Sequence, residues 1–326
     1  MSKPIIVSGI QPTGNLHVGN YLGAVKNWVE LQNSGKYQLY IFIADLHSLT
    51  GKSSAVELKK QTKITAAELL AAGINPDKTT FFVQSQIKEH VELAWIFNCV
   101  TPMGELERMT QYKDKTAQFK MATAGLFAYP VLQAADILMY KGDLVPVGQD
   151  QVQHVELTRD VARWFNNKYG EFFPETKHLL TNVPKVMSLL EPEKKMSKSL
   201  GVGHVIELCD DPEEILNKLK RAVTATSGGE KAPGVANLLG LLKEFGDEKT
   251  YKEFVLAEKG GSIRYGDLKS VLSKIISDYF AEFREKRAKL LKDDKKLDKI
   301  LANGAKKARN EAQKNMKEVY KLVGIN

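Results

Sequence analysis

The sequence predicts an α/β fold, with a parallel β-sheet in the first part of the chain and helices alone in the second part. Up to about residue 170, short apolar runs alternate with longer segments of helical period, as parallel strands joined by crossover helices do. After about residue 204, only helical patterns remain. The 326 residues suit two domains, and an apolar content of 43% is enough for a buried core.

The first part of the chain contains four runs that are short and apolar enough to be strands. They are Pro4–Val7, Gln38–Ile43, Thr80–Gln84 and Leu144–Val147. The helical segments between and after them are Tyr21–Leu31, Ala55–Ala72, Glu89–Val100, Ala122–Tyr140 and Asp150–Lys168. This alternation predicts a Rossmann-like parallel sheet.

A loop-rich segment, Thr176–Gly203, separates this part from the helical part. The helices expected beyond it are Pro212–Val223, Val235–Phe245, Lys249–Glu258, one long segment Ile263–Leu301, and Ala305–Leu322. We therefore expect a Rossmann-like α/β domain over residues 1–203 and an all-helical domain over residues 204–326, with room for the last helix to pack back on the first domain.

The net charge of +8 is located entirely at the C-terminal end of the chain. From Arg284 to Asn326 there are 14 Lys and Arg residues against 6 Asp and Glu residues, and the rest of the chain sums to zero. Such a basic excess is expected of a surface that meets a polyanion, although a solvated helix face can have the same composition.

Composition excludes two other classes of protein. Cys99 and Cys209 lie far apart and form no CxxC pair, so neither a disulfide framework nor a thiolate zinc site is predicted. The beginning of the chain lacks the pattern of a signal peptide, and no apolar run approaches about 18 residues. We expect a soluble, cytoplasmic protein without a membrane partner.

Two segments could hold a nucleotide. The first, Gln11–Asn20 (QPTGNLHVGN), joins the first strand to a helix start, where backbone N–H groups meet phosphate, and His17 and Asn20 add donors. A plain connection with a satisfied histidine is the alternative. The second, Lys195–Ser199 (KMSKS), is a loop with two lysines. Phosphoryl transfer to an anionic nucleophile needs positive charge and aligned attack rather than a general base, which the two segments together could supply.

No other nucleotide or nucleophile motif is present. The sequence has no complete P-loop, no GxGxxG after the first strand and no GxSxG, and no set of residues has metal-ligand spacing. No protein-bound metal is therefore predicted.

HVGN (His17–Asn20) with KMSKS resembles the paired HIGH and KMSKS signatures of class I aminoacyl-tRNA synthetases. Four longer segments resemble the bacterial-type tryptophanyl-tRNA synthetases in particular. They are SGIQPTGNLHVGNYLGA at Ser8–Ala24, GELERMTQYKDK at Gly104–Lys115, AGLFAYPVLQAADILMY at Ala124–Tyr140 and VPVGQDQVQHVELTRD at Val145–Asp160.

The resemblance implies a ligase that activates L-tryptophan with ATP and then transfers it to tRNA(Trp). It implies catalytic roles for His17, Asn20, Lys195 and Lys198, with Mg²⁺ accompanying the ATP. The ATP-binding residues implied are Gln11, Pro12, Thr13, Gly19, Asn20, Gly148, Gln149, Asp150, Val186, Lys195, Met196, Ser197, Lys198 and Ser199. It further implies a homodimer and tRNA binding by the C-terminal helices.

For the amino acid, the resemblance implies that Asp136 reads the indole and that Tyr129, Gln133 and Gln151 face the amino group. The physical reason for an aspartate is that the indole N–H only donates, so a buried acceptor suits it. Tyr129, Gln133 and Asp136 have the i, i+4, i+7 spacing of one helix face. A carboxylate on the helix surface is the alternative for Asp136.

Some positions depart from the family pattern. Gln149 stands where Glu is usual, and Gln133 stands where many relatives have Met, as in the sister tyrosyl enzymes; HVGN and Ala135 favour tryptophan. The stretch Ala222–Leu239 is shorter than the corresponding stretch in the family, so the family's anticodon contacts do not carry over to it in detail. Tyrosine activation and a non-catalytic tRNA-binding paralogue remain as alternatives, whereas small-molecule adenylyltransferases, which share HIGH-like residues, are usually shorter and lack this basic helical tail.

Overall fold

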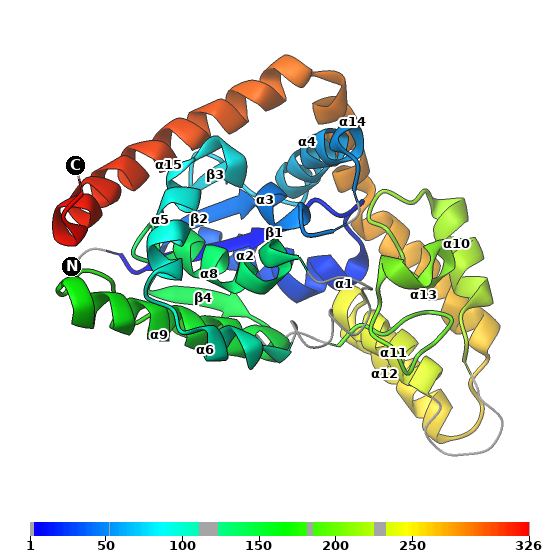
Figure 1. Cartoon of the computed structure of the whole chain (residues 1–326). Helices are drawn as coiled ribbons and strands as arrows, with labels where there is room; N and C mark the ends of the chain where they lie inside the picture. The colour runs from blue at the N-terminus through cyan, green and yellow to red at the C-terminus, as the bar shows by residue number, and fades with distance from the viewer. Residues whose placement is uncertain (1–2, 52, 111–122, 181–184, 225–232, 326) are drawn as a thin grey trace.

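A five-stranded parallel sheet forms the centre of the N-terminal part of this computed structural model (Figure 1). The structure describes residues 3–51, 53–110, 123–180, 185–224 and 233–325. Over these residues the strand order is β3-β2-β1-β4-β5, and every pairing is parallel. The strands are β1 (Ile5–Ile10), β2 (Gln38–Ile43), β3 (Thr79–Val83), β4 (Leu144–Val147) and β5 (Lys177–Leu180). The α/β class predicted from the sequence is confirmed.

Helices cover both faces of the sheet. Those that connect or follow the strands are α1 (Val18–Asn20), the π-helical turn η1 (Tyr21–Val25), α2 (Lys26–Ser34), α3 (Asp45–Ser48), α4 (Ala55–Ala71), η2 (Gln84–Gln86), α5 (Glu89–Asn98), α6 (Met103–Glu107), α8 (Ala124–Leu138), η3 (Gln149–Gln151) and α9 (Val152–Tyr169). Helices α2 and α4 connect β1, β2 and β3 and cover one face of the sheet. Helices α5, α8 and α9 follow β3 and β4 and cover the other face. This is a doubly wound arrangement.

Alternate strand residues face the two helix layers, as the two-residue period of a strand requires. On β2, Leu39, Ile41 and Ile43 pack with the layer of α2 and α4. Tyr40 and Phe42 pack with the layer of α5, α8 and α9. All five are buried, so each face of the sheet contributes to a separate apolar core.

The C-terminal part of the chain is helical over its described residues. Its elements are η4 (Lys198–Leu200), η5 (Val202–His204), α10 (Pro212–Arg221), α11 (Pro233–Phe245), α12 (Glu248–Lys259), α13 (Tyr265–Tyr279), α14 (Ala281–Lys292) and α15 (Asp294–Val323). The core of this part is continuous with the α2 and α4 layer, since Leu268, Leu272 and Ile276 of α13 belong to the same cluster as β2 residues.

Helix α15 returns across the N-terminal part and lies along β3 and α5 (Figure 1). Its Gly304 approaches β3 so closely that a Cβ there would lie 1.7 Å from the Phe81 carbonyl oxygen, which only glycine permits. Farther along, the Asn315 side chain donates to the Met139 carbonyl at 2.8 Å. The chain end is thereby attached to the sheet domain.

Three expectations from the sequence need correction. The segment Lys177–Leu180 was expected to be loop but forms β5, because it pairs with β4 despite a mixed composition. The expected long helix Ile263–Leu301 is three helices, broken at Phe280 and at Asp293, whose side chain accepts from the Lys296 N–H and so starts α15. Ala305–Leu322 is no separate helix but part of α15.

The described part of the chain contains no helix with the length and apolar character needed to cross a membrane.

Candidate functional site

The candidate site lies at the carboxyl ends of the parallel strands. The chain passes from β1 to β2 and β3 on one side of the sheet, and then to β4 and β5 on the other side of β1. Between β1 and β4 the strand order therefore reverses, which is where open α/β sheets bind ligands. The turn Gln11–Asn20 follows β1, and Gly148 and Gln149 follow β4, so both turns leave this edge as neighbours.

His17 and Asn20 hold the turn after β1 in shape by capping each other. The His17 Nδ1 accepts from the Asn20 N–H at 3.3 Å, and the Asn20 Oδ1 accepts from the His17 N–H at 3.2 Å. This reciprocal capping box starts α1. Gly19 is needed beside it, because a Cβ at Gly19 would lie 2.9 Å from the imidazole Cε1. With Nδ1 accepting, the proton of a neutral His17 imidazole is on Nε2.

Burial, together with the positive charges of Lys198 and Lys195, lowers the pKa of His17 to about 4. The imidazole is 7% exposed. At neutral pH His17 is therefore an uncharged hydrogen-bond donor through Nε2 and not a cation.

The KMSKS segment closes on this turn from a distance of nearly 180 residues in sequence. The Lys198 Nζ donates to the Thr13 carbonyl at 3.4 Å. A Cβ at Gly14, whose φ is +95°, would lie 2.9 Å from the same Nζ, so the lysine lies directly on the turn. Burial lowers the pKa of Lys198, while the carboxylates of Glu207 and Glu68 act in the opposite direction.

Met196 anchors the KMSKS segment in the core. Its side chain is buried, in the same apolar cluster as Val18 and Val186. Its N–H donates to the Val186 carbonyl at 2.9 Å. Lys195, by contrast, is exposed. The segment thus presents one exposed lysine and one that is folded on the turn after β1.

The hydroxyls of the segment organise its end. Ser197 is the N-cap of η4, and its Oγ lies 2.9 Å from the Ser199 Oγ. The strand-like part before it is tied to α11, since the Asn237 side chain accepts from the Met187 N–H and donates to the Met187 carbonyl, both at 2.9 Å.

Asp136 of α8 is the centre of a buried polar cluster and is fully inaccessible to solvent. The Gln84 Nε2 donates to both carboxylate oxygens at 2.8 Å. The His47 Nε2 lies 2.9 Å from Oδ2, and the His90 Nδ1 lies 2.5 Å from Oδ1. Burial raises the pKa of Asp136, but the hydrogen bonds and charge of His47 and His90 outweigh burial and keep it below its ordinary value. The surface alternative for this carboxylate is excluded.

Other residues predicted for the amino acid lie around this cluster. The Tyr129 ring lies edge-on to His47, with 6.3 Å between centroids, and its hydroxyl is 2.9 Å from the His154 Nε2. Burial raises the pKa of Tyr129 to about 12, so its hydroxyl stays protonated. Gln133, half-buried, shares the helix face of Tyr129 and Asp136.

The predicted residues after β4 are less closely associated with the turn after β1 and KMSKS, and with the cluster around Asp136. Gly148 is the N-cap of the short helix η3, Gln149 is exposed and Gln151 is half-buried. The side chain of Asp150 lies outside the described residues. Of the predicted ATP-binding residues, hydrogen bonds join Lys198 to Thr13 and Met196 to Val186, and Gly19 of HVGN lies close to the Met196 side chain; Gly148 and Gln149 follow the neighbouring strand.

The sequence interpretation missed the three donors to Asp136. Two of them carry a signal, because Gln84 directly follows β3 and His47 lies in α3, the short helix after β2, at the edge where parallel strands place functional residues. His90 carries no such signal, since it lies within α5 and is fully buried.

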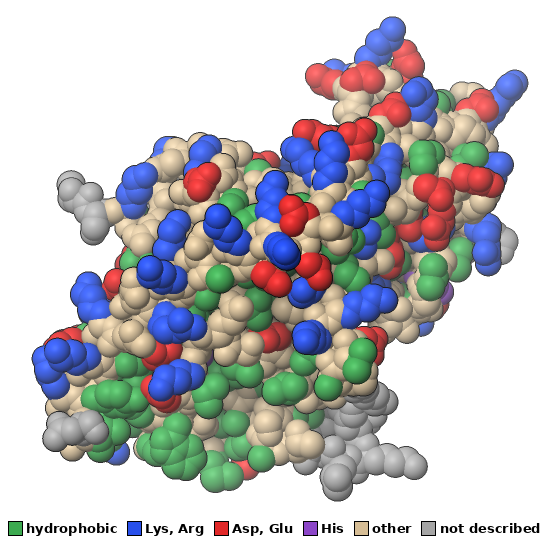
Figure 2. All heavy atoms as spheres, turned by 90° about the horizontal axis from the view of Figure 1, so that it is seen from above, with side chains coloured by type: hydrophobic (Ala, Val, Ile, Leu, Met, Phe, Trp, Pro, Cys, Tyr) green, Lys and Arg blue, Asp and Glu red, His purple; other side chains and the backbone are tan. Residues whose placement is uncertain are grey.

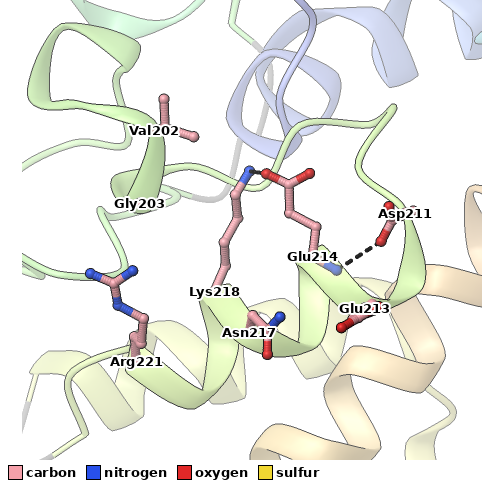
Figure 3. Close-up of a pocket in the computed structure, with 8 residues that line it drawn as sticks. All are labelled: Val202, Gly203, Asp211, Glu213, Glu214, Asn217, Lys218 and Arg221. Carbon is pink, nitrogen blue, oxygen red and sulfur yellow. Dashed lines mark hydrogen bonds and ion pairs between the residues drawn. The ribbon is translucent and has the colours of Figure 1, made fainter.

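Within the described residues, no three His, Cys, Asp or Glu side chains are grouped as a metal site requires. A separate hollow of about 380 Å³ lies between η5 and α10 (Figure 3). There the Lys218 amine is paired with Glu214 at 3.2 Å and with Asp210 at 2.6 Å, so its one buried cation is already neutralised.

Comparisons with known proteins agree on one family. The model of the class I tRNA synthetases for tryptophan and tyrosine matches residues 1–281. Tryptophan–tRNA ligase 2 of Streptomyces avermitilis is 44% identical, over 99% of this chain and 97% of that protein.

Two solved structures are similar over almost the whole chain. The tryptophanyl-tRNA synthetase of Campylobacter jejuni, complexed with ADP and tryptophan, has a TM-score of 0.88 at 38% identity and covers 98% of this chain and 100% of its own. The enzyme of Mycoplasma pneumoniae has a TM-score of 0.87 at 32% identity, covering 100% and 99%.

Proposed function

We infer that this chain, which belongs to the class I tRNA synthetases for tryptophan and tyrosine, is a tryptophan–tRNA ligase. It activates L-tryptophan with ATP and transfers the tryptophanyl group to tRNA(Trp). The observation that supports the activation step is the hydrogen bond from the Lys198 Nζ to the Thr13 carbonyl, which holds KMSKS against the turn that leads into HVGN. The choice of tryptophan is supported by the 44% identity to a tryptophan–tRNA ligase.

In activation, a carboxylate oxygen of tryptophan bonds to the α-phosphorus of ATP, and the bond from that phosphorus to the bridging oxygen of pyrophosphate breaks. The nucleophile is already an anion, so no base is needed. The task of the protein is to align attack and to stabilise charge on the leaving group. Lys195 and Lys198 supply that charge, and the neutral His17 donates to a phosphate oxygen from Nε2.

The ATP lies between the turn after β1, the turn after β4 and the KMSKS segment. Gln11, Pro12, Thr13, Gly19 and Asn20 form the floor, and Gly148, Gln149 and Asp150 hold the adenosine side. Val186, Met196, Ser197 and Ser199 shape the closing segment. Mg²⁺ enters with the ATP as part of the substrate, held chiefly by phosphate oxygens, as is usual for this ion.

The indole of tryptophan binds against Asp136. A carboxylate offers about four acceptor positions, and His47, Gln84 and His90 donate to it here. The indole N–H takes the remaining position or replaces the donor from His47, whose ring also borders Tyr129. Tyr129, Gln133 and Gln151 then face the amino group. A side chain without an N–H leaves this acceptor unsatisfied, which is the basis of discrimination.

The C-terminal helices bind tRNA(Trp), within a domain that covers residues 204–326. Lys and Arg side chains are spread over the face of α15 (Figure 2). The exposed ones include Lys306, Lys307, Lys314, Lys317 and Lys321. We expect the tRNA dissociation constant to rise steeply with salt, because bound cations are released from the phosphates. A nearly salt-independent affinity would contradict this role for the basic surface.

The enzyme is a cytoplasmic homodimer that uses an apolar patch on α5 and α6. Trp95 is 71% exposed, Val91 on the same face is 51% exposed, and Met103 at the start of α6 is 67% exposed. A solvated tryptophan with an exposed valine one helical turn before it marks an interaction surface. A second copy is the occupant we propose, since cyclic dimers are the commonest oligomers.

Charging of tRNA with radiolabelled tryptophan or tyrosine tests the proposal. We expect transfer of tryptophan to tRNA(Trp) that depends on ATP. Preferential transfer of tyrosine would identify the tyrosine enzyme instead, and absence of transfer of either amino acid would identify a non-catalytic relative.

A further inference from the structure

An ion pair between a fully buried carboxylate and a partly buried arginine links helix α14 to the HVGN turn. Glu68 of α4 has no exposure to solvent, and its Oε2 accepts from the Leu16 N–H at 2.6 Å. Its Oε1 accepts from the Arg287 Nε at 2.8 Å. Leu16 directly precedes His17, so one carboxylate connects the backbone of the turn to a residue about 270 positions downstream, on a helix that packs against α4.

The same arginine also reaches the turn by a second route. The Arg287 Nη2 donates to the Asn15 Oδ1 at 3.2 Å, and the Asn15 Nδ2 donates to the Glu207 Oε2 at 2.7 Å. Two adjacent residues of the turn, Asn15 and Leu16, are therefore held by one guanidinium, directly and through Glu68. A guanidinium is suited to this because its donors have a fixed planar arrangement, unlike a lysine amine.

The segment around Glu207 holds the next residues of the turn. The Val18 N–H donates to the Ile206 carbonyl at 2.9 Å, and the Leu208 N–H donates to the Leu16 carbonyl at 2.8 Å. With Asn15 bonded to the Glu207 side chain, the turn is fixed on both sides. Its position relative to Lys198, and hence to the nucleotide, depends on these bonds.

The buried carboxylate would be costly without its partner. Burial raises the pKa of Glu68, whereas the Leu16 N–H and Arg287 act to lower it. Removing the cation leaves either an unpaired buried charge, which destabilises the folded turn, or a protonated acid, which accepts more weakly from the Leu16 N–H.

We propose that Arg287 is a positioning residue for the ATP step: from helix α14 it fixes Asn15 and, through Glu68, Leu16, and thereby places the HVGN turn against the nucleotide. The inference rests on the proposed activation of tryptophan by ATP. It does not extend to the amino-acid pocket, since the donors to Asp136 come from His47, Gln84 and His90 and not from this network.

The test compares two variants in tryptophan-dependent exchange of pyrophosphate with ATP. Arg287→Lys keeps the charge but cannot hold Glu68 and Asn15 together. Asn15→Ala removes the bond from Arg287 to the turn but leaves the Arg287–Glu68 pair intact. It therefore tests whether the position of the turn matters for ATP even if Arg287→Lys folds poorly. For both we expect kcat/KM for ATP to fall about 10- to 100-fold, because small misplacements at a reacting site have effects of this size. The KM for tryptophan should stay within about twofold of the wild-type value, since the other pocket is untouched.

Lys63→Met is the matched control. Lys63 also lies on α4 and also pairs with C-terminal helix residues, Asp294 at 3.2 Å and Asp298 at 3.4 Å, but it contacts no residue of the turn in these pairs. Its kinetics should equal those of the wild type.

Three results would overturn the inference: an unchanged kcat/KM for ATP in both variants, an equal loss for ATP and tryptophan, or the same loss in the control. Failure of the proposed function appears separately, as a wild-type protein that exchanges nothing with tryptophan.

Discussion

Asp136→Asn tests the assignment of the indole acceptor most sharply. The carboxylate accepts from three side chains at 2.5–2.9 Å, whereas an amide has one acceptor oxygen and turns an N–H₂ group toward donors. At least one buried donor loses its partner, which should lower the free energy of unfolding by about 1–3 kcal/mol. The hydrogen bond from the indole N–H to a charged acceptor is worth about 1.5–3 kcal/mol, so kcat/KM for tryptophan should fall about 10- to 150-fold.

The assay is pyrophosphate exchange with tryptophan and with its benzothiophene analogue, in which sulfur replaces the N–H. The wild-type enzyme should strongly prefer tryptophan, and the Asp136→Asn variant should lose most of that preference. Asp160→Asn is the control, because it makes the same change at a partly exposed carboxylate of α9, which is paired with Arg163 at 3.6 Å. It should leave kcat/KM unchanged for both tryptophan and the analogue. An Asp136→Asn variant that retains the full preference for tryptophan would refute the assignment of this carboxylate.

Three further predictions concern His17, Lys195 and the exposed apolar patch on α5. Because the folded pKa of His17 is about 4 and its ordinary value is 6.5, the unfolded chain binds the extra proton first, so stability should fall as the pH falls through this window. Wild-type unfolding free energy should drop by about 2 kcal/mol more than that of His17→Asn between pH 7.5 and pH 5 in urea titrations; equal drops would contradict the assigned pKa. Lys195→Ala should slow single-turnover adenylate formation about 100- to 1000-fold, which is the usual effect of losing a charge-stabilising donor. The control is Lys194→Ala, which removes the neighbouring lysine and its ion pair with Glu191 and should leave the rate of adenylate formation unchanged. Trp95→Glu should sediment as a monomer at micromolar concentration where the wild type sediments as a dimer, and a dimeric variant would move the interface elsewhere.

Much of the fold could be predicted from local patterns. The runs Gln38–Ile43 and Leu144–Val147 are strands with the predicted bounds, because continuous apolar runs between helical segments suit strands buried on both faces. The short strand β5 could not be predicted, since Lys177–Leu180 has no apolar run and depends on pairing with β4. The breaks between α13, α14 and α15 were missed because the helical period continues across them.

The candidate site divides in the same way. HVGN and KMSKS could be recognised because each is a contiguous segment with its own chemistry, and the structure brings them together through Lys198 and Thr13. The surroundings of Asp136 could not be predicted, because its donors come from three separate segments and each donor is an ordinary residue by itself. Arg287 is similarly indistinct, since it is one basic residue among many near the C-terminus.

The central claim is that this protein activates tryptophan with ATP. Tryptophan-dependent exchange of labelled pyrophosphate into ATP, measured with tryptophan and tyrosine in parallel, tests it most directly. We predict rapid exchange with tryptophan and exchange with tyrosine near the background rate. Faster exchange with tyrosine, or none with either amino acid, would contradict the claim.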